Sequence, residues 1–338
     1  MLSNSAFVTV GESRKTVDAM AAHTHPRGEY SILRECFSKT VAQIETPHPP
    51  GTFAGDFRFA VKAQFATWHT DNVYLGEEFP GIQFLALEAI RPKKRRRIVM
   101  LIHNVSSLKR VLPLTALRLG RLVDHFLCLS ERSRAELRSR YGVSDSRITV
   151  VNSRVDTDFF RPDPSVQIER MVSSAGAINR DFDTLIEAVV PLGVTTKIAA
   201  DTAWRYSAKT ERRRTLPESV EMRSWGTYLN LRALYARSAV VVVPLHREML
   251  SGVTVALEAM AMGRPVILTR NPYVEDFIAD GETGFFVPAH DAGALRARIS
   301  ELLEDPHRAV EMGARARKWV EEHFSLERYV SRILSAWG

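Results

Sequence analysis

The residues best suited to chemistry lie between Val240 and Pro288. A run of valines, Val240 to Val243, predicts a buried strand, and after a short loop the pair Ser251-Gly252 predicts the start of a helix. We expect Ser251 to cap this helix and Gly252 to let a ligand approach the backbone closely. The amide N–H groups of the first turn lack partners within the helix, so they attract an anion such as a nucleotide diphosphate.

The same helix carries Glu258, two turns after Ser251 and on the same face. The axial rise between them is roughly 10 Å, about the span from a diphosphate to the ribose hydroxyls, whose hydrogens a carboxylate could accept. A surface glutamate is the alternative interpretation. The neighbours at positions 257 and 259–261 are apolar or small, however, so the helix is predicted to be buried, and a buried glutamate without a partner is costly. We therefore favour a ligand-binding role for Glu258.

The elements that must position these residues alternate along the chain. Arg97 to Ile102 (RIVMLI) and His125 to Leu129 (HFLCL) are typical of buried strands, and the helical pattern Glu131 to Tyr141 follows the second of them. Such alternation predicts parallel sheets covered by helices. The polar, proline-bearing segment Asn152 to Pro164 is typical of a linker. We therefore predict two doubly wound α/β domains, with a ligand outside the carboxyl ends of their strands.

Composition narrows the class of protein. A chain of 338 residues suits two domains, and 45% hydrophobic with 25% charged residues is ordinary for a globular protein. The two cysteines, Cys36 and Cys128, are too few for a disulfide framework or a four-ligand zinc site, and they favour a reduced, cytoplasmic setting. No export signal is recognisable, and no apolar run approaches the ~20 residues of a membrane span. We expect a cytoplasmic protein that is at most peripheral to a membrane.

The net charge of +7 suits phosphorylated ligands, nucleic acid or anionic lipid. Its densest cluster is Arg91 to Arg97 (RPKKRRR), which is either a solvated turn or a contact with the inner face of an anionic membrane, worth about 1 kcal/mol per basic residue. We expect no nucleic-acid partner, because the cluster has no interleaved aromatic residues. A nicotinamide enzyme is disfavoured, because no G-x-G-x-x-G motif follows a strand.

The segment Leu257 to Ile267 (LEAMAMGRPVI) resembles the donor-binding helix and strand of GT-B fold, retaining glycosyltransferases of the large family-four type. Further blocks of that family match in order: the loop of Glu275, the turn Asp280 to Phe285 (DGETGF) with Val287-Pro288, the linker Val155 to Pro162, and the loop and helix Gly176 to Ile186. The resemblance covers about residues 98 to 335 and is strongest from 240 to 290. It is far more specific than an isolated glycine motif.

The resemblance implies transfer of a sugar from a nucleoside-diphosphate sugar, with UDP or GDP as the nucleotide, with net retention and without a metal. Glu258 would bind the donor ribose, and the amides of Ser251 to Val253 would hold the diphosphate or the sugar. Arg180, in the loop that starts at Gly176, would neutralise the diphosphate, and a fixed guanidinium does stabilise such a leaving group. The alternative for Arg180 is a surface charge at a helix start.

Two further residues have competing interpretations. His103, at the end of a strand, matches a histidine that the family uses to contact the transferred sugar, or it simply caps a loop. Trp225 stacks on the nucleotide base or packs in the core. By the resemblance the acceptor is a saccharide, a lipid-linked molecule or a small molecule.

The sequence departs from the family pattern where the sugar should bind. The family carries a glutamate eight residues before the one at 258, and this chain has Leu250 there, so the nearby Glu248 is our candidate for the sugar. Ala177 stands where the first basic residue of the loop should be, and the family's glycine-rich acceptor loop is not recognisable. These departures keep a nucleotide-binding pseudoenzyme or assembly subunit as the alternative, and they leave the sugar, the base, the acceptor, the stereochemistry and the oligomeric state open.

The family architecture divides the chain into four parts. Residues 1–152 are expected to form an acceptor-binding Rossmann-like domain, and residues 153–165 a linker. Residues 166–322 would form the nucleotide-sugar-binding Rossmann-like domain, which faces the first across the active-site cleft of a GT-B fold. Residues 323–338, an amphipathic helical pattern, would brace the first domain. No motif accounts for residues 1–60.

Overall fold

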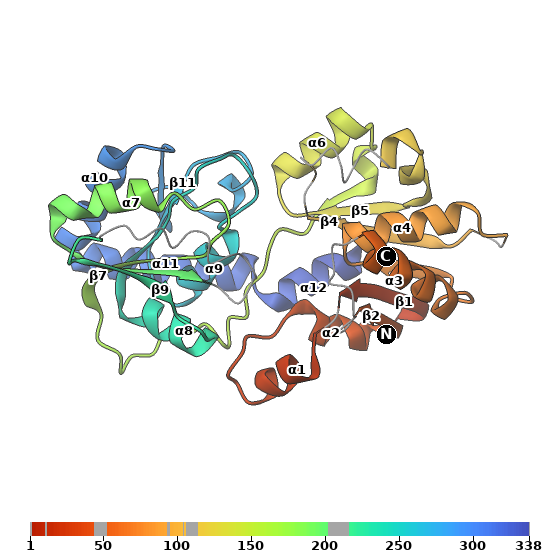
Figure 1. The fold of residues 1–338 in the computed structure, drawn as a ribbon, viewed down its shortest axis with the longest axis horizontal. Coiled ribbons are helices and arrows are strands. Elements are labelled where there is room, and N and C mark those ends of the chain that lie inside the picture. The colour runs from red at the N-terminus through yellow and green to blue at the C-terminus, as the bar shows by residue number, and fades with distance from the viewer. Residues whose placement is uncertain are drawn as a thin grey trace. The chain divides into compact units, whose positions relative to one another are not determined.

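The computed structural model describes residues 2–10, 12–43, 53–92, 95–103, 105, 114–201 and 216–337 (Figure 1). The chain separates into two compact units: unit 1 comprises residues 1–21, 27–152 and 329–338, and unit 2 comprises residues 22–26 and 153–328. Each unit is built on one six-stranded sheet in which every pair of neighbouring strands is parallel. The predicted α/β class with two helix-covered parallel sheets is confirmed.

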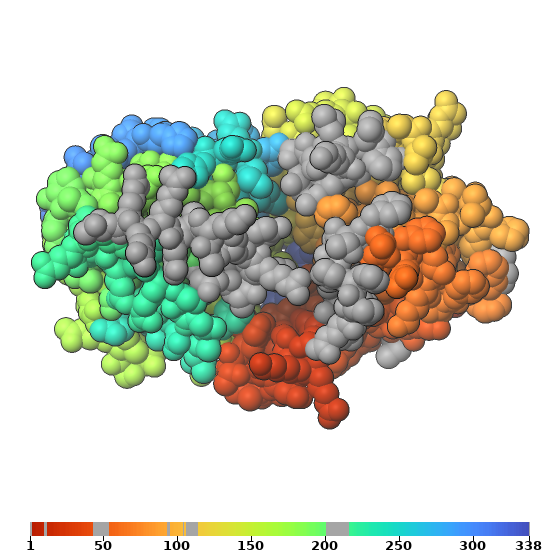
Figure 2. Space-filling model, in the orientation of Figure 1, coloured from red at the N-terminus to blue at the C-terminus, as the bar shows by residue number. Residues whose placement is uncertain are grey.

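The sheet of unit 1 has the strand order β2-β1-β3-β4-β5-β6. Its strands are β1 (Leu2–Val10), β2 (Phe37–Gln43), β3 (Asn72–Leu75), β4 (Arg97–Ile102), β5 (His125–Cys128) and β6 (Ile148–Val150). Its helices are α1 (Arg14–Ala21), α2 (Glu29–Cys36), α3 (Phe53–Ala66), α4 (Glu78–Ala89) and α6 (Glu131–Tyr141), with short 3-10 turns η1 (Leu119–Leu122) and η2 (Asp145–Arg147). Helix α1 buries none of its residues and lies at the surface in Figure 2.

The local sequence explains why β4 and α6 form in unit 1. Five consecutive residues of β4, Ile98 to Ile102, are buried, as expected where helices cover both faces of a parallel sheet. Helix α6 begins where Ser130 accepts a hydrogen bond from the Ser133 amide, and it ends at Gly142, which has a left-handed φ of 63°. Local sequence therefore sets both the strand and the limits of the helix.

The sheet of unit 2 has the order β12-β11-β10-β7-β8-β9. Its strands are β7 (Glu169–Ala175), β8 (Thr195–Asp201), β9 (Val220–Ser224), β10 (Ser238–Val243), β11 (Val266–Thr269) and β12 (Gly284–Val287). Its helices are α7 (Phe182–Val189), α8 (Tyr228–Arg237), α9 (Val253–Ala261), α10 (Ala292–Glu304) and α11 (Pro306–His323), with 3-10 turns η3 (Val190–Leu192) and η4 (Glu275–Phe277).

The valine run of β10 divides between two hydrophobic cores. Val240 and Val242 pack in one cluster with residues of α7 and α10, whereas Val241 and Val243 pack in another with residues of α8 and α9. Side chains alternate between the faces of a strand, so a strand with helices on both faces must be apolar throughout. Strand β10 therefore lies in the middle of unit 2, and the loop after it starts from a rigid position.

The last helix, α12 (Leu326–Ser335), leads the chain end into unit 1. Arg97 at the start of β4 donates hydrogen bonds to the carbonyl oxygens of Trp337, at 3.0 Å, and Ala336, at 2.8 Å. The Trp337 ring packs edge-on against Phe37, with centroids 5.9 Å apart. The chain end is thus held by the N-terminal sheet. No helix among the described residues is long and apolar enough to cross a membrane.

Two arginines of the basic cluster are internal. Arg96 is 1% exposed at its side chain and donates to the Glu88 carboxylate at 2.6 Å and to the Thr67 carbonyl at 2.6 Å. Arg91 also pairs with Glu88, at 3.1 Å. Both the solvated-turn and the membrane interpretations are wrong for these two side chains, which compensate the buried Glu88 carboxylate together with the Gln64 amide, a donor at 3.0 Å.

Two other basic residues of the cluster lie nearer the surface. Arg97 donates to the Trp337 carbonyl at the chain end, and Arg95 is exposed and pairs with Asp124 at 2.8 Å. Lys93 and Lys94 lie outside the described residues. The charge available to an anionic surface is therefore smaller than the sequence RPKKRRR suggests.

Two glycines allow α11 to lie close against the end of α9. A Cβ on Gly313 would lie 2.1 Å from the carbonyl oxygen of Gly263, which itself follows α9 with a left-handed φ of 67°. Arg317 of α11 donates to the Ala261 carbonyl at 2.7 Å, and so satisfies one of the last carbonyl groups of α9. This contact fixes the far end of the helix whose start is of functional interest.

We predict that Gly313→Ala destabilises the protein by about 2–3 kcal/mol, because the methyl group meets backbone that cannot move aside. The matched control is Gly293→Ala in α10, where the nearest heavy atom to the new Cβ is the Asp291 carboxylate at 3.3 Å. That change should be neutral or slightly stabilising, since alanine favours a helix by about 0.5–1 kcal/mol over glycine. Urea denaturation of both variants measures the difference, and equal midpoints would contradict the close packing.

Candidate functional site

Helix α9 begins at the carboxyl edge of the sheet of unit 2 with no side-chain cap among the described residues. Gly252 occupies the cap position with φ 81° and ψ −16°, and its carbonyl accepts the first helical hydrogen bond, from Ala256, at 3.0 Å. The prediction that Ser251 caps the helix is wrong. Its hydroxyl instead donates to the Ile178 carbonyl, in the loop after β7, at 3.2 Å. The amides of the first turn, from Val253 on, therefore remain suited to an anion.

Two glycines let the loops at this edge meet. A Cβ on Gly252 would lie 2.6 Å from Val243, and a Cβ on Gly176 would lie 2.5 Å from the Arg180 guanidinium. Both residues also have positive φ, 81° and 97° respectively, which L side chains rarely adopt. Glycine at 176 thus gives the Arg180 side chain its room, and glycine at 252 lets the start of α9 approach Val243 of β10.

Arg180 is held between the two loops. Its Nε donates to the Ala175 carbonyl at 2.8 Å, and its Nη1 donates to the Ile178 carbonyl at 2.9 Å and to the Ser251 hydroxyl at 3.2 Å. The two hydrogens on Nη2 have no partner among the described residues. Burial lowers the pKa of Arg180 to about 10, while Tyr235 and Glu258 act in the opposite direction, so the side chain stays cationic at neutral pH. Arg180 is half-buried, and its three hydrogen bonds favour a fixed cation over a solvated surface charge.

Glu258 is buried, as its apolar neighbours predicted, with only 5% of the residue exposed. The hydroxyl of Tyr235, itself fully buried, donates to the Glu258 carboxylate at 3.2 Å. Burial raises the pKa of Glu258 to about 8, although the Tyr235 hydrogen bond and the positive charge of Arg180 oppose the rise. Sequence reasoning missed Tyr235, whose place opposite Glu258 depends on how α8 packs beside α9.

Glu248 and Trp225 do not join this group of residues. Glu248 is exposed and has no hydrogen bond or ion pair among the described residues, and Leu250 packs against the core instead. Trp225 also packs partly against the core, its ring lies 4.3 Å from the Arg223 guanidinium, and its N–H has no partner within the described part of the chain. The contacts of Trp225 favour core packing over stacking on a base.

His103 belongs to unit 1, at the end of β4. Its Nδ1 lies 3.0 Å from the Glu78 carboxylate, and its backbone amide donates to the same oxygen at 3.2 Å. Burial alone would raise the pKa of Glu78, but the hydrogen bonds and charge of His103 lower it below the ordinary value. An ionised Glu78 thus fixes the His103 ring. The sequence held a signal for Glu78, since Glu77-Glu78 follow the strand pattern NVYL and Gly76.

Two family models match the chain. The model for glycosyl transferases group 1 matches residues 181–319, and the model for glycosyltransferase family 4 matches residues 21–159. The first lies within unit 2, and the second lies almost wholly within unit 1.

Two curated relatives share just under 30% sequence identity with this chain over the aligned residues. A D-inositol 3-phosphate glycosyltransferase of Gordonia bronchialis is 29% identical over 241 residues, which are 64% of this chain and 52% of that protein. A GDP-mannose-dependent alpha-(1-6)-phosphatidylinositol monomannoside mannosyltransferase of Mycolicibacterium smegmatis is 28% identical over 263 residues, 68% of this chain and 66% of that protein. The matches thus span between about half and two-thirds of the relatives' length.

Solved structures share the architecture at lower identity. Sucrose-phosphate synthase from Thermosynechococcus elongatus has a TM-score of 0.75 at 16% identity and covers 98% of both chains. Anabaena HepE in complex with UDP has a TM-score of 0.73 at 16% identity and covers 98% of this chain and 99% of that one. These likenesses show the two-domain α/β GT-B fold. Since the models of one enzyme group match both halves of a chain with that fold, the protein belongs to the GT-B glycosyltransferases of the group 1, or family-four, type.

Proposed function

We propose that the protein transfers a sugar from a nucleoside-diphosphate sugar to an acceptor hydroxyl. The observation that carries the proposal is a buried carboxyl, Glu258, in a helix whose start has no side-chain cap among the described residues and lies beside a half-buried cation, Arg180. A diphosphate suits the helix start and the guanidinium, and ribose hydroxyls suit the carboxylate. The donors named for similar proteins include GDP-mannose and, in HepE, UDP-glucose, so we propose UDP or GDP as the nucleotide.

In the proposed reaction the bond between the anomeric carbon and the diphosphate oxygen breaks, and a bond forms to the acceptor oxygen. Charge develops on the leaving diphosphate, which Arg180 and the amides of Gly252 and Val253 stabilise without a metal. The acceptor proton passes to the leaving phosphate on the same face of the sugar, which gives retention. Both the retention and the metal independence belong to the proposal.

His103 is proposed to contact the transferred sugar. The ionised Glu78 carboxylate fixes the orientation of the His103 ring at the end of β4, where we propose that the ring meets a sugar hydroxyl. Glu248 stays our candidate for a second sugar contact, and Trp225 for the base, although no contact among the described residues supports either. If Glu248 and Leu250 leave the sugar unbound, the chain would bind nucleotide without transfer, as a pseudoenzyme or an assembly subunit.

The acceptor and the setting are also proposals. One relative is named for transfer to a phosphatidylinositol mannoside and another for transfer to inositol phosphate, so we propose a saccharide, a lipid-linked molecule or a small molecule as acceptor. We also propose a cytoplasmic location with peripheral contact to an anionic membrane. Among the described arginines of the cluster that contact would use Arg95, since Arg91 and Arg96 face the interior and Arg97 is bonded to the chain end.

We predict that Arg180→Met weakens binding of UDP or GDP by roughly 10- to 100-fold, the effect of losing a charged hydrogen bond. The matched control is Arg298→Met on α10, where the arginine is exposed and pairs with Glu301, and affinity should not change. Titration calorimetry measures the binding, and thermal unfolding checks that both variants fold. If neither nucleotide binds the unaltered protein, the proposal fails.

We predict that nucleotide binding near pH 7 releases a proton from Glu258, because its pKa is about 8 in the free protein and ribose hydroxyls favour the ionised form. Calorimetry in two buffers with different ionisation heats measures the release. Glu258→Gln should remove that release. Equal proton release from the variant and the unaltered protein would show that the carboxyl does not meet the ribose.

The same carboxyl should make stability depend on pH. Its pKa is raised from 4.5 to about 8 by folding, so the folded form holds a proton that the unfolded form loses between these values, and stability should fall as pH rises from about 4.5 to 8. Glu258→Gln cannot ionise, so its melting temperature should exceed that of the unaltered protein by a margin that grows over this range. A constant margin would contradict the raised pKa.

We predict that His103→Ala lowers the transfer rate by about tenfold or more, the value of one lost hydrogen bond to the sugar, and leaves nucleotide affinity unchanged. Glu78→Gln keeps the size of the side chain but loses the charge that fixes the ring, so it should show a smaller loss of rate. Steady-state kinetics measure the transfer rate, and calorimetry measures the nucleotide affinity. A loss of nucleotide affinity in His103→Ala would assign the residue to another role.

A further inference from the structure

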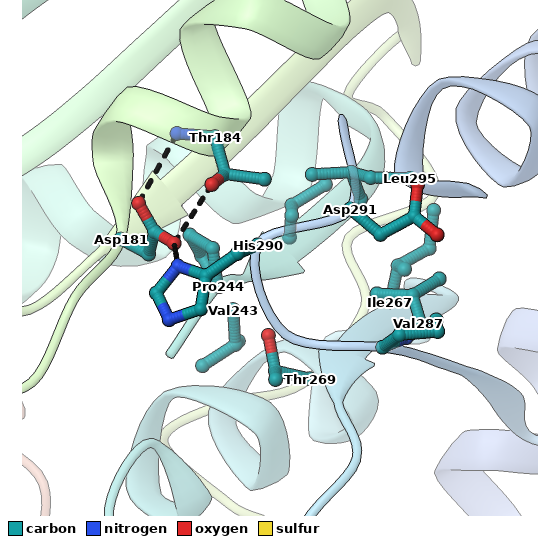
Figure 3. Close-up of a pocket in the computed structure, with 12 residues that line it drawn as sticks. Asp181, Thr184, Val243, Pro244, Ile267, Thr269, Val287, His290, Asp291 and Leu295 are labelled. Atoms are coloured by element: carbon teal, nitrogen blue, oxygen red, sulfur yellow. Dashed lines mark hydrogen bonds and ion pairs between the residues drawn. The ribbon is translucent and has the colours of Figure 1, made fainter. Parts of the chain in front are cut away.

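Three loops at the carboxyl edge of the sheet of unit 2 bring together a carboxylate and two imidazoles. Asp181 follows β7, His246 follows β10, and His290 follows β12. Figure 3 shows His290 directed at the Asp181 carboxylate, which lies at the start of α7. The proposed transfer uses none of these three residues, and neither the family resemblance nor the spacing of the sequence singled them out.

The distances suit a metal ion. His290 Nδ1 lies 2.7 Å and His246 Nδ1 lies 3.6 Å from the same oxygen of Asp181, and all three ligand atoms lie within 4.8 Å of one another. Zinc bound tetrahedrally at about 2.1 Å holds its ligand atoms about 3.4 Å apart. The His246 distance is already close to that value, and the His290 distance needs to open by less than about 1 Å.

The hydrogen bonds of His290 point to the same conclusion. Its Nε2 lies 3.1 Å from the His246 carbonyl oxygen, while its Nδ1 faces a carboxylate. A neutral imidazole has one N–H, so when Nε2 donates to the carbonyl, Nδ1 presents a lone pair toward the carboxylate. A metal ion between the two groups suits that arrangement, and a second ring nitrogen that donates to a backbone carbonyl is the usual support of a metal-bound histidine.

The carboxylate is held in a fixed position. Asp181 is buried, its Oδ1 accepts from the Thr184 amide at 3.1 Å, and its Oδ2 accepts from the Thr184 hydroxyl at 2.7 Å. These two hydrogen bonds fix the side chain at the start of α7, where Oδ2 also lies next to both histidines. A ligand group that is already oriented loses little freedom when an ion binds.

The loops that carry the histidines are built to hold them. His290 has a left-handed φ of 58°, a conformation that is uncommon for residues other than glycine and that costs energy. Asn179 accepts from the Arg247 amide at 3.0 Å and donates to the Arg247 carbonyl at 2.9 Å, which ties the loop after β7 to the loop of His246. The backbone at His290 and the hydrogen bonds between the two other loops thus hold the three side chains close together, as a binding site requires.

A path for the ion is present. His246 and His290 are 46% and 58% exposed at their side chains, and they line an open hollow of about 570 Å³ with Ile178, Asn179, Arg247 and Met249. An ion bound by the three residues would therefore have a coordination position facing the hollow, which water could occupy.

We propose that Asp181, His246 and His290 bind one divalent transition-metal ion, with Zn²⁺ as the best match for two imidazoles and one carboxylate. Mg²⁺ and Ca²⁺ prefer oxygen ligands throughout, so they fit poorly. This proposal differs from the expectation that the chain has no metal site, and it is independent of the sugar transfer, which is proposed to need no metal. The ion would link the loop that carries Arg180 to the loop that leads to Ser251.

The test uses the full chain after treatment with a chelator. Titration with Co²⁺, followed by its visible absorption, and with Zn²⁺, followed by competition with a chromophoric chelator, should give one ion per chain with at least micromolar affinity. His246→Ala and His290→Ala should each weaken binding by about a hundredfold or more. Asp181→Asn should do the same while its amide oxygen still caps α7, so a loss of folding does not explain the result.

The matched control is His307→Ala, because His307 is 85% exposed on α11 and is not part of the three-residue group. It should bind the ion as the unaltered chain does, and Zn²⁺ should raise the melting temperature of both. The proposal is overturned if the unaltered chain binds neither ion at micromolar concentrations. It is equally overturned if the His246, His290 and Asp181 variants bind as tightly as the control.

Discussion

The burial of one carboxyl group, that of Glu258, is the constraint on which the proposed site in unit 2 depends. Glu258 lies inside a helix that is buried along nearly its whole length, and it has one hydroxyl, from Tyr235, and the charge of Arg180 to compensate its own burial. That compensation is incomplete, as the raised pKa shows. A ligand that offers hydroxyl hydrogens to Glu258 and a diphosphate to Arg180 would complete the compensation. The unfavourable burial of Glu258 in the free protein therefore favours binding of such a ligand.

The packing around this helix supports the same interpretation. The alternating valines of β10 fix the point at which its loop leaves the sheet, and the close contact between Gly263 and Gly313 fixes the other end of α9. Between them, Gly252 must take a left-handed turn. The helix start is therefore positioned by the core and not by contacts of its own, which leaves its amides available.

Much of this could be predicted from the sequence, because the signals were local. Strands buried on both faces are continuous apolar runs, and helices start and end at residues such as Ser130 and Gly142 whose preferences are local as well. The burial of Glu258 followed from its neighbours along one helix. The pattern of the family then connected these segments into a fold.

What could not be predicted depends on contacts between distant segments. Ser251 was expected to cap α9, but it serves the loop of Arg180. Arg96 reads as a surface charge within a basic run, yet it pairs with Glu88 on a helix that packs beside it. Asp181, His246 and His290 are 65 and 44 residues apart along the chain, counted as 246 − 181 and 290 − 246, and only the order of strands in the sheet brings them together.

The most direct measurement is a crystal structure of the protein with UDP bound. The account predicts that both ribose hydroxyls lie within about 3 Å of the Glu258 carboxylate, with the diphosphate at the start of α9 and against the Arg180 guanidinium. A nucleotide bound elsewhere, with the Glu258 carboxyl still closed off by Tyr235 and out of reach of any ligand, would contradict it.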